Sequence, residues 1–411
     1  MSTANQRLAV VLTHPTQYYS PWFRSVSSQG GVTLRVFYLW DFGVTHQTDP
    51  NFGKTIKWDV DLLSGYDHEF VPNLSKSPGA QSFFGFSNPG LTNRIADWNP
   101  DAVLLFGYKW SSHIKVALWA WRTGIPVIFR GDSHLIGRGS PGLFTKALLG
   151  LLFSRFAAFL YVGAANRAYF KAFGVSDRKL FFAPHSVDAT LFNPSKPDVA
   201  ANALRQREQL GLTSGTVVVL YSGKLVAAKQ PVELLEAFAK LDRKNTALVF
   251  VGDGPERETL ERMVAVRSRQ PQNSSVHLLP FSNQSEMPAR YALCDIFVLP
   301  SRGLYETWGL AVNEAMHMGV PCLVSDRVGC QMDLVSDGKT GWVFSADDSD
   351  GLRRALSTSL GDMDEPGRRE QIRGAVESRI RGYDYLATTK GLLAALESLP
   401  SAAMRSSPPT V

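Results

Sequence analysis

The chain has 411 residues, of which 44% are hydrophobic and 19% charged, and its formal net charge is +6. This length is enough for two domains of roughly 100 to 200 residues each. The three cysteines, Cys294, Cys322 and Cys330, are too few for a disulfide framework and lack metal-type spacing, so the composition excludes a small disulfide-stapled domain and favours a globular protein of a reducing compartment.

The first predicted element is a strand at residues 8–12, which is too short an apolar run for the core of a signal peptide. Residues 142–162 are the most apolar stretch of the chain, but Lys146 and Arg155 interrupt it. A charge near the centre of a bilayer is costly. We therefore expect no membrane-spanning helix and a cytoplasmic protein.

Short apolar runs rich in β-branched or aromatic residues alternate with longer amphipathic stretches, which is the pattern of βαβ units around a parallel sheet. The predicted strands lie at residues 8–12, 33–39, 102–106, 126–129, 159–162, 216–221, 247–251, 276–279, 296–299, 321–324 and 341–344. The expected fold class is α/β, with two Rossmann-like, doubly wound domains facing each other across a cleft.

A segment of proline, small and charged residues at 193–215 predicts the break between the domains. We expect an N-terminal domain at residues 1–200 and a C-terminal domain at 201–380. Residues 381–400 are expected to form a helix that packs back on the N-terminal domain. Residues 401–411 are rich in serine and proline and are expected to be disordered.

The positive charge is concentrated in the first domain. Residues 1–200 contain 19 Lys/Arg and 12 Asp/Glu, whereas the rest of the chain contains 24 and 25. This asymmetry suits an anionic partner, although solubility charge without a partner explains it equally well. With the apolar residues 142–162 it suggests peripheral contact with an anionic membrane, at its inner face; a core helix followed by a strand is the favoured alternative for that segment. Nucleic acid is the least favoured partner.

Ligands of parallel sheets bind beyond the carboxyl ends of the strands, so binding and catalytic residues are expected directly after each strand. Glu306 and Glu314 follow one predicted strand, with Gly309 between them at the start of a predicted helix. The N–H groups of Trp308, Gly309 and Leu310 at such a helix start could bind a diphosphate. The two carboxylates are hydrogen-bond acceptors only and suit polyols. Taken alone, the glutamates are better explained as a helix cap and a surface residue.

A second group follows the strand predicted at residues 216–221, which ends in Ser222-Gly223-Lys224, with Lys229 at the start of the next helix. A glycine permits close approach, and two lysines could neutralise a diphosphate leaving group. A single lysine at this place would usually be solvated.

Four segments, in this order and spacing, resemble the C-terminal domain of family-4 retaining glycosyltransferases with the GT-B fold, the glycosyl transferases group 1. They are SGKLVAAKQPVELLEAF, FVGDGPERETLE, LPFSNQSEMPARYALCDIFVLPS and ETWGLAVNEAMHMGVPCLVSD. The chain departs from the family pattern at Lys224, where arginine is usual, and at Trp308, where phenylalanine is usual. Lysine keeps the charge but loses the planar fork that grips phosphate at two points.

The resemblance implies that the C-terminal domain binds the nucleotide-sugar and the N-terminal domain the acceptor. It implies contacts of Glu306 with donor-sugar hydroxyls, of Glu314 with the ribose, and of the loop ending at Phe281 with the nucleobase. Lys224 and Lys229 would bind the diphosphate, beside Gly223 and the helix start.

The first half resembles the family only through its architecture and the segment APHSVDATLFNP at residues 183–194. The loop HPTQYY at residues 14–19 lacks the family's paired glycines, so it is expected either to reach the donor through side chains, with Gln17 as the candidate, or to stand further back. His14 is better explained as a turn residue than as a proton carrier.

Asp132 stands where the family commonly has a histidine near the reacting sugar, and His134 is the second candidate. An equally good alternative is that Arg130 and Asp132 pair to stabilise their loop. The segment Gly107-Tyr108-Lys109-Trp110 could contact an acceptor, or could be ordinary packing at a helix start. The match to Asp-x-Asp at residues 58–61 lacks a nucleotide-site context, and no metal is assigned to it.

We therefore predict a retaining hexosyltransferase without a metal or other cofactor, whose co-substrate is a UDP-sugar, with a GDP-sugar as the second choice. The acceptor is a glycan, a lipid-linked glycan or a small molecule. The alternatives are a nucleotide-sugar epimerase or hydrolase on the same scaffold, since fold does not fix chemistry, and a non-catalytic sugar-nucleotide-binding protein.

Overall fold

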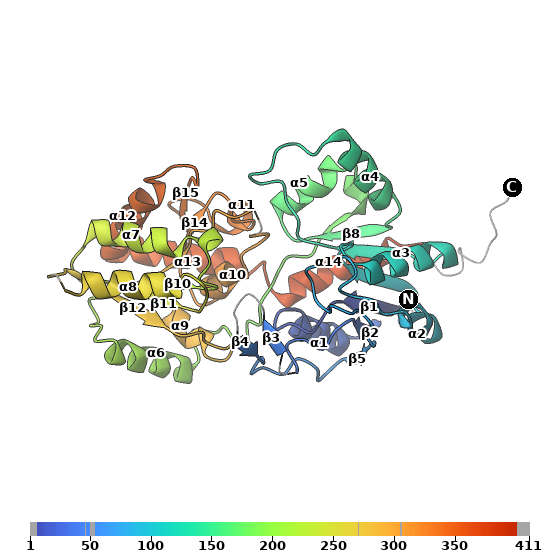
Figure 1. The fold of residues 1–411 in the computed structure, drawn as a ribbon, viewed down its shortest axis with the longest axis horizontal. Helices are drawn as coiled ribbons and strands as arrows, with labels where there is room; N and C mark the ends of the chain where they lie inside the picture. The colour runs from blue at the N-terminus through green and yellow to red at the C-terminus, as the bar shows by residue number, and fades with distance from the viewer. Residues whose placement is uncertain (1–5, 46, 50–53, 270, 305, 401–411) are drawn as a thin grey trace.

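The computed structural model describes residues 6–45, 47–49, 54–269, 271–304 and 306–400. Two α/β domains lie side by side (Figure 1), each built on a parallel sheet. The N-terminal sheet has the order β5-β2-β1-β6-β7-β8-β9. Its strands are β1 (Gln6–Leu12), β2 (Val32–Tyr38), β5 (Asp67–Phe70), β6 (Ala102–Phe106), β7 (Val127–Arg130), β8 (Ala158–Tyr161) and β9 (Leu180–Phe182).

The C-terminal sheet has the order β12-β11-β10-β13-β14-β15. Its strands are β10 (Val217–Ser222), β11 (Thr246–Val251), β12 (Ser274–Leu279), β13 (Ile296–Leu299), β14 (Cys322–Ser325) and β15 (Gly341–Phe344). Every residue of β11, β13 and β14 is buried, as expected of parallel strands covered by helices on both faces.

Helices connect these strands and cover both sheets. The N-terminal domain has α1 (Tyr19–Gln29), α2 (Leu91–Trp98), α3 (Ser111–Thr123), α4 (Leu143–Ser154) and α5 (Ala164–Ala172). The rest of the chain has α6 (Pro197–Gln209), α7 (Pro231–Leu241), α8 (Arg257–Arg267), α9 (Met287–Ala292), α10 (Leu310–His317), α11 (Gln331–Leu334), α12 (Gly351–Asp364), α13 (Pro366–Ile380) and α14 (Tyr385–Glu397). In the described part of the chain, no helix has both the length and the apolarity needed to span a bilayer.

The expected α/β class with two doubly wound domains is confirmed. Each of the predicted strands is present within about two residues, which is the usual uncertainty of element ends. Two short strands of the N-terminal sheet, β5 and β9, were not predicted, nor was the antiparallel pair β3 (Gln47–Asp49) and β4 (Lys54–Ile56).

The last helix returns to the N-terminal domain, where α14 packs against β8, β9 and α1 (Figure 1). Gly391 lies so close to β9 that a Cβ atom there would be 2.0 Å from the carbonyl oxygen of Phe182. Trp22 Nε1 of α1 donates a hydrogen bond of 3.1 Å to Thr389 Oγ1 of α14. The helix therefore links the end of the second domain to the first. The tail predicted at 401–411 lies outside the described residues.

In both sheets the strand order reverses beside the first strand, between β1 and β6 and between β10 and β13. Ligands of doubly wound sheets bind in the crevice at such switch points. The loops that follow β1, β6, β10 and β13 are thus placed to form one site between the domains.

Candidate active site

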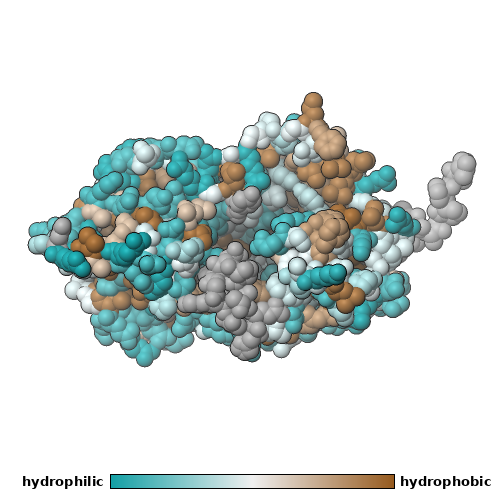
Figure 2. Space-filling model, viewed as in Figure 1, coloured by the Kyte–Doolittle hydropathy of each residue, from teal (hydrophilic) through white to brown (hydrophobic). Residues whose placement is uncertain are grey.

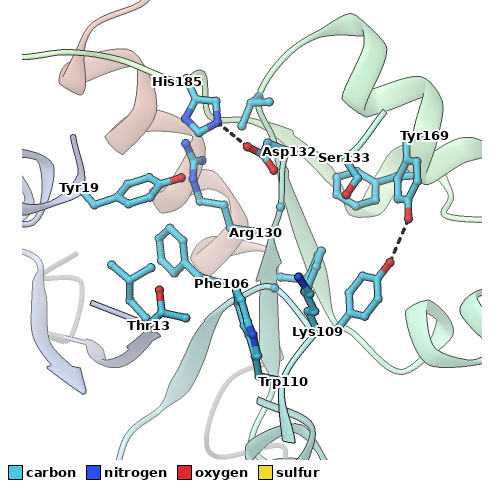
Figure 3. Close-up of a pocket in the computed structure, with 17 residues that line it drawn as sticks. Thr13, Tyr19, Phe106, Lys109, Trp110, Arg130, Asp132, Ser133, Tyr169 and His185 are labelled. Carbon is cyan, nitrogen blue, oxygen red and sulfur yellow. Dashed lines mark hydrogen bonds and ion pairs between the residues drawn. The ribbon is translucent and has the colours of Figure 1, made fainter. Parts of the chain in front are cut away.

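Two adjoining cavities lie at these strand ends. The N-terminal pocket has a volume of about 440 Å³ and is lined by the first domain alone (Figure 3). The interdomain pocket has a volume of about 330 Å³ and is lined by both domains. Asp132 and His185 line both cavities and so mark the place where they meet.

The wall of the interdomain pocket after β10 contains Gly223, Lys224 and Lys229. The Nζ atom of Lys229 lies 3.0 Å from Oε2 of Glu306, and the Ser301 hydroxyl donates to the same oxygen at 2.9 Å. Both side chains of the ion pair are partly exposed to the pocket. An ammonium group has three donors, so Lys229 can hold Glu306 and still bind an anion.

The start of α10 forms another part of the pocket wall. Gly309, the residue before the helix, has a φ of 97°, in the left-handed region that favours glycine. A Cβ atom there would lie 3.0 Å from side-chain atoms of Leu299 and Val328. Trp308, Gly309 and Leu310 line the pocket. The first N–H groups of a helix have no partner within it, and they form a positive end that binds anions.

Glu314, one turn further along α10, is buried with 4% of its surface exposed, so the alternative of a surface helix residue is wrong. Its carboxylate accepts hydrogen bonds from Tyr18 Oη at 3.1 Å, Gln284 Nε2 at 3.1 Å and Tyr291 Oη at 2.8 Å. Burial raises the pKa of Glu314, although these three donors oppose the shift. Two carboxylate oxygens have about four acceptor positions, so one position remains for a ligand hydroxyl.

Phe281 and Trp58 also line the interdomain pocket, with their ring centroids 6.4 Å apart. The Phe281 N–H donates to Asp253 Oδ2 at 3.1 Å, and Arg257 Nη1 lies 3.1 Å from Asp253 Oδ1. Gln17 lines the same pocket from the first domain. The two aromatic rings therefore offer a flat apolar surface to a ring of the ligand. The ion pair of Asp253 with Arg257 fixes the loop that carries Phe281.

Asp132 is held by both domains at the junction of the cavities. Its Oδ2 accepts a hydrogen bond of 2.8 Å from Thr307 Oγ1 and lies 3.6 Å from Nε2 of His185 (Figure 3). Burial raises the pKa of Asp132, but His185 and the Thr307 hydroxyl outweigh it and leave the pKa below its ordinary value. Burial lowers the pKa of His185 by more than the neighbouring Asp132 carboxylate raises that pKa. The junction thus presents an ionised carboxylate beside a neutral imidazole.

Arg130 and Asp132 do not form the ion pair that was the alternative for this loop. The Arg130 guanidinium is buried and donates to the carbonyl oxygens of Ala183 at 2.8 Å and Pro184 at 3.3 Å. It also lies 5.1 Å from the ring centroid of Trp22. Arg130 thereby fixes the segment that precedes His185.

His134 lines neither cavity. Its Nδ1 accepts a hydrogen bond of 3.1 Å from the Ile136 N–H, and its Nε2 lies 3.2 Å from the carbonyl oxygen of Glu306. Both ring nitrogens therefore contact backbone, and the ring joins the loop after β7 to the loop that presents Glu306. This placement favours Asp132 over His134 as the polar group at the reacting centre.

Aromatic and basic side chains form the rim of the N-terminal pocket. Tyr108 and Tyr169 share a hydrogen bond of 3.0 Å between their hydroxyls, and Lys109 and Trp110 also line the pocket (Figure 3). This is the segment singled out in the sequence as a candidate acceptor contact. The cavity could accommodate a ligand with both apolar surface and hydroxyl groups.

The residues predicted for the donor all line the interdomain pocket. They are Gln17, Gly223, Lys224, Lys229, Phe281, Glu306, Trp308, Gly309, Leu310 and Glu314. Their roles remain predictions, because the pocket gives positions and not ligand contacts. Sequence reasoning missed Tyr18, Gln284 and Tyr291 around Glu314, and His185 beside Asp132. A signal for His185 existed, since it follows the strand β9, but that strand was not predicted.

The Asp-x-Asp match near Trp58 has other contacts. Asp59 accepts a hydrogen bond of 3.2 Å from the Ser285 N–H of the second domain. Asp61 accepts from the N–H groups of Leu63 and Ser64, and these bonds lower its pKa. The pair is engaged in a domain contact and a turn.

Residues 202–375 match the sequence model of the family described as glycosyl transferases group 1. A relative from Mycolicibacterium smegmatis, a GDP-mannose-dependent alpha-(1-6)-phosphatidylinositol monomannoside mannosyltransferase, is 36% identical over 222 residues, which cover 52% of this chain and 54% of the relative. The alpha-D-kanosaminyltransferase of Streptomyces kanamyceticus is 32% identical over 177 residues, 43% of each chain. The chain thus matches only about half the length of these curated relatives.

The likeness of the fold extends over the whole chain. The crystal structure of Anabaena Alr3699/HepE in complex with UDP and glucose superposes with a TM-score of 0.69 at 16% sequence identity, and the match covers 96% of this chain and 100% of that one. At this identity the likeness shows the fold alone. Residues 202–375 are thus similar to the glycosyl transferases group 1, and the chain as a whole has the two-domain GT-B fold.

Proposed function

We propose that this protein is a retaining glycosyltransferase that binds a nucleoside-diphosphate hexose in the interdomain pocket and an acceptor in the N-terminal pocket. One observation supports this most strongly: Lys224, Lys229 and the start of α10 surround the same cavity as Glu306 and Glu314. The two lysines and the start of α10 would bind the diphosphate, and the two glutamates would accept hydrogen bonds from the hydroxyl groups on either side of it.

The donor would lie along this pocket. Its nucleobase would contact Phe281, its ribose would donate to the remaining acceptor position of Glu314, and its hexose would donate to Glu306. A UDP-hexose and a GDP-hexose are the two donors to compare first, since a GDP-mannose enzyme and a structure with UDP and glucose are both among the proteins similar to this chain.

The acceptor hydroxyl would attack the anomeric carbon from the face on which the diphosphate departs. The bond from that carbon to the diphosphate oxygen breaks as the new glycosidic bond forms, and the hydroxyl proton passes to the departing diphosphate. Lys224, Lys229 and the start of α10 stabilise the charge that develops there. Asp132 accepts a hydrogen bond where the cavities meet, and thus orients the reactants without forming a covalent intermediate.

The first test is the melting temperature with UDP, GDP and ADP. A nucleotide at 100 times its Kd should add about 2.7 kcal/mol to the stability of the folded state. One nucleotide should raise the melting temperature of the wild-type protein and of the control Lys240→Ala, on the exposed side of α7, and should act much less on Lys229→Ala. Equal shifts in both variants would count against the site.

The second test separates transfer from the alternatives. The radiolabelled sugar of the preferred donor should pass to a glycan or lipid fraction only when an acceptor extract is present. An epimerised sugar-nucleotide formed without acceptor would instead assign an epimerase. Binding of nucleotide without transfer to any extract would assign a binding protein.

A further inference from the structure

The helix α4 exposes an apolar surface that the fold leaves uncovered. Four large side chains project from it, with exposed fractions of 87% for Leu143, 82% for Phe144, 56% for Leu148 and 63% for Leu151. Of the twelve residues in the helix, Phe153 alone is buried. Figure 2 shows the resulting hydrophobic patch at the top of the first domain. The alternative of a core helix at residues 142–162 therefore holds for the strand β8 but not for α4.

The four exposed side chains lie on one side of the helix. At 100° per residue they fall within an arc of about 140°. On the other side, the Phe153 ring packs against Phe129 and Tyr169, with centroids 5.8 Å and 6.3 Å away. An apolar helix is normally buried, and a contiguous exposed patch marks a surface that meets another phase or partner.

The segment of the sequence that contains α4 is basic. From Ser133 to Ser176 the chain contains no aspartate or glutamate, whereas it contains five basic residues. They are Arg138, Lys146, Arg155, Arg167 and Lys171, of which Arg167 and Lys171 form ion pairs with Asp177. Lys146 lies within α4 and Arg155 directly follows it, and both are exposed. A protein partner needs no such exclusion of acidic groups, but an anionic lipid surface does.

We propose that the exposed side of α4, together with Lys146 and Arg155, docks on an anionic lipid bilayer. Twelve residues give a helix about 18 Å long, and spanning the hydrocarbon core takes about 20 residues. The helix would therefore lie in the interface, with Leu143, Phe144 and Leu151 among the acyl chains and the basic groups at the phosphates.

The proposal also bears on the acceptor, and this step rests on the proposed function. The inner residue Phe153 packs against Tyr108 and Tyr169, which line the N-terminal pocket. A bilayer that holds α4 would thus lie beside the acceptor cavity. An acceptor anchored by a lipid could then reach the pocket without leaving the membrane.

The test is co-sedimentation of the full-length protein with phosphatidylcholine vesicles, with and without phosphatidylglycerol. The wild type should bind the anionic vesicles and lose binding as salt rises. The double variant Leu143→Asp/Phe144→Asp should bind on the order of 100-fold more weakly, because two apolar side chains no longer enter the interface. Lys146→Gln should bind roughly 5-fold more weakly. Leu204→Asp, at a leucine of α6 with the same exposed fraction as Leu151, 63%, is the control and should bind as the wild type does.

Vesicle binding needs no donor, so it can fail or succeed independently of nucleotide binding. Absence of wild-type binding to anionic vesicles would overturn the proposal, as would equal loss in the α4 and Leu204 variants. If the wild type is instead a dimer that the α4 substitutions separate, and no vesicle binds it, the patch is a contact between copies of this chain. A melting curve like that of the wild type would show that each variant is folded.

Discussion

Replacement of Lys229 by alanine tests the proposed stabilisation of the leaving group. Its ammonium is 3.0 Å from Glu306, with 28% of the side chain and 15% of the partner's exposed, so the charge acts in a partly desolvated pocket. Loss of one preorganised charge-stabilising donor typically costs about 100- to 1000-fold in kcat, or about 2.7 to 4 kcal/mol. We expect Lys229→Ala to fall in this range, with Lys240→Ala near wild type.

The ion pair with Glu306 allows a sharper comparison. If Lys229 acted only by holding Glu306, the double variant Lys229→Ala/Glu306→Gln would be no slower than Glu306→Gln alone. If Lys229 contacts the diphosphate, the double variant should be slower than Glu306→Gln by a further factor on the order of 100. Steady-state kinetics with a fixed donor would give both ratios. Near-normal turnover of Lys229→Ala would show that Lys229 does not stabilise the leaving group.

Three further substitutions test other parts of the site. Because burial raises the pKa of Glu314, its contribution to the free energy of unfolding is full below about pH 4.3 and is lost as pH rises through the raised pKa. Glu314→Gln should therefore lose less stability than the wild type between about pH 4 and 7, as measured by urea titrations. Equal losses in the two proteins would contradict this prediction. The pKa of Asp132 is lowered in the folded protein, so the carboxylate stabilises the fold above about pH 3.9, and this stabilisation is lost as pH falls through the lowered pKa. The stability of Asp132→Asn should therefore fall less in acid than that of the wild type. Parallel acid unfolding curves of the two proteins would contradict this prediction. A Cβ atom at Gly163 would lie 2.5 Å from the Trp308 ring, so Gly163→Ala should force the domains apart. We expect this variant to have a kcat/KM at least about 10-fold lower than the wild type. Gly367→Ala is the control, because a Cβ atom at Gly367 meets open space, and its kcat/KM should stay unchanged.

Strands were predictable because each is a short apolar run with a turn signal after it, and parallel sheets place those turns at one edge. Lys224 and Glu306 were found in this way, since each follows a strand that the sequence marks clearly. Their joint placement around one cavity depends on the order β11-β10-β13, which places their strands next to each other.

The groups around Glu314 could not be predicted in the same way. Tyr18 and Gln284 are 296 and 30 residues from Glu314 in the chain, and no local pattern indicates that they meet. The Tyr18 contact requires the two domains to close on each other, whereas Gln284 reaches Glu314 from within the same domain. Both contacts depend on tertiary structure, which is why a surface position was a reasonable alternative from the sequence.

His185 and α4 show two other limits. His185 follows β9, a strand of three residues with no buried position, so periodicity gave no sign of it. For α4 the sequence indicated the right element but the wrong surroundings, because an apolar helix is usually covered. Hydropathy alone does not distinguish a helix covered by its own fold from one whose cover is outside the chain.

A crystal structure with UDP or GDP bound is the most direct test of the proposed donor site. We expect the diphosphate between Lys229 and the start of α10, within hydrogen-bond distance, about 2.7 to 3.2 Å, of Lys229 Nζ and of an N–H group at Gly309 or Leu310. We also expect a ribose hydroxyl on Glu314. A nucleotide bound elsewhere, with the interdomain pocket free of it and Glu314 still held only by its three protein donors, would rule out this donor site.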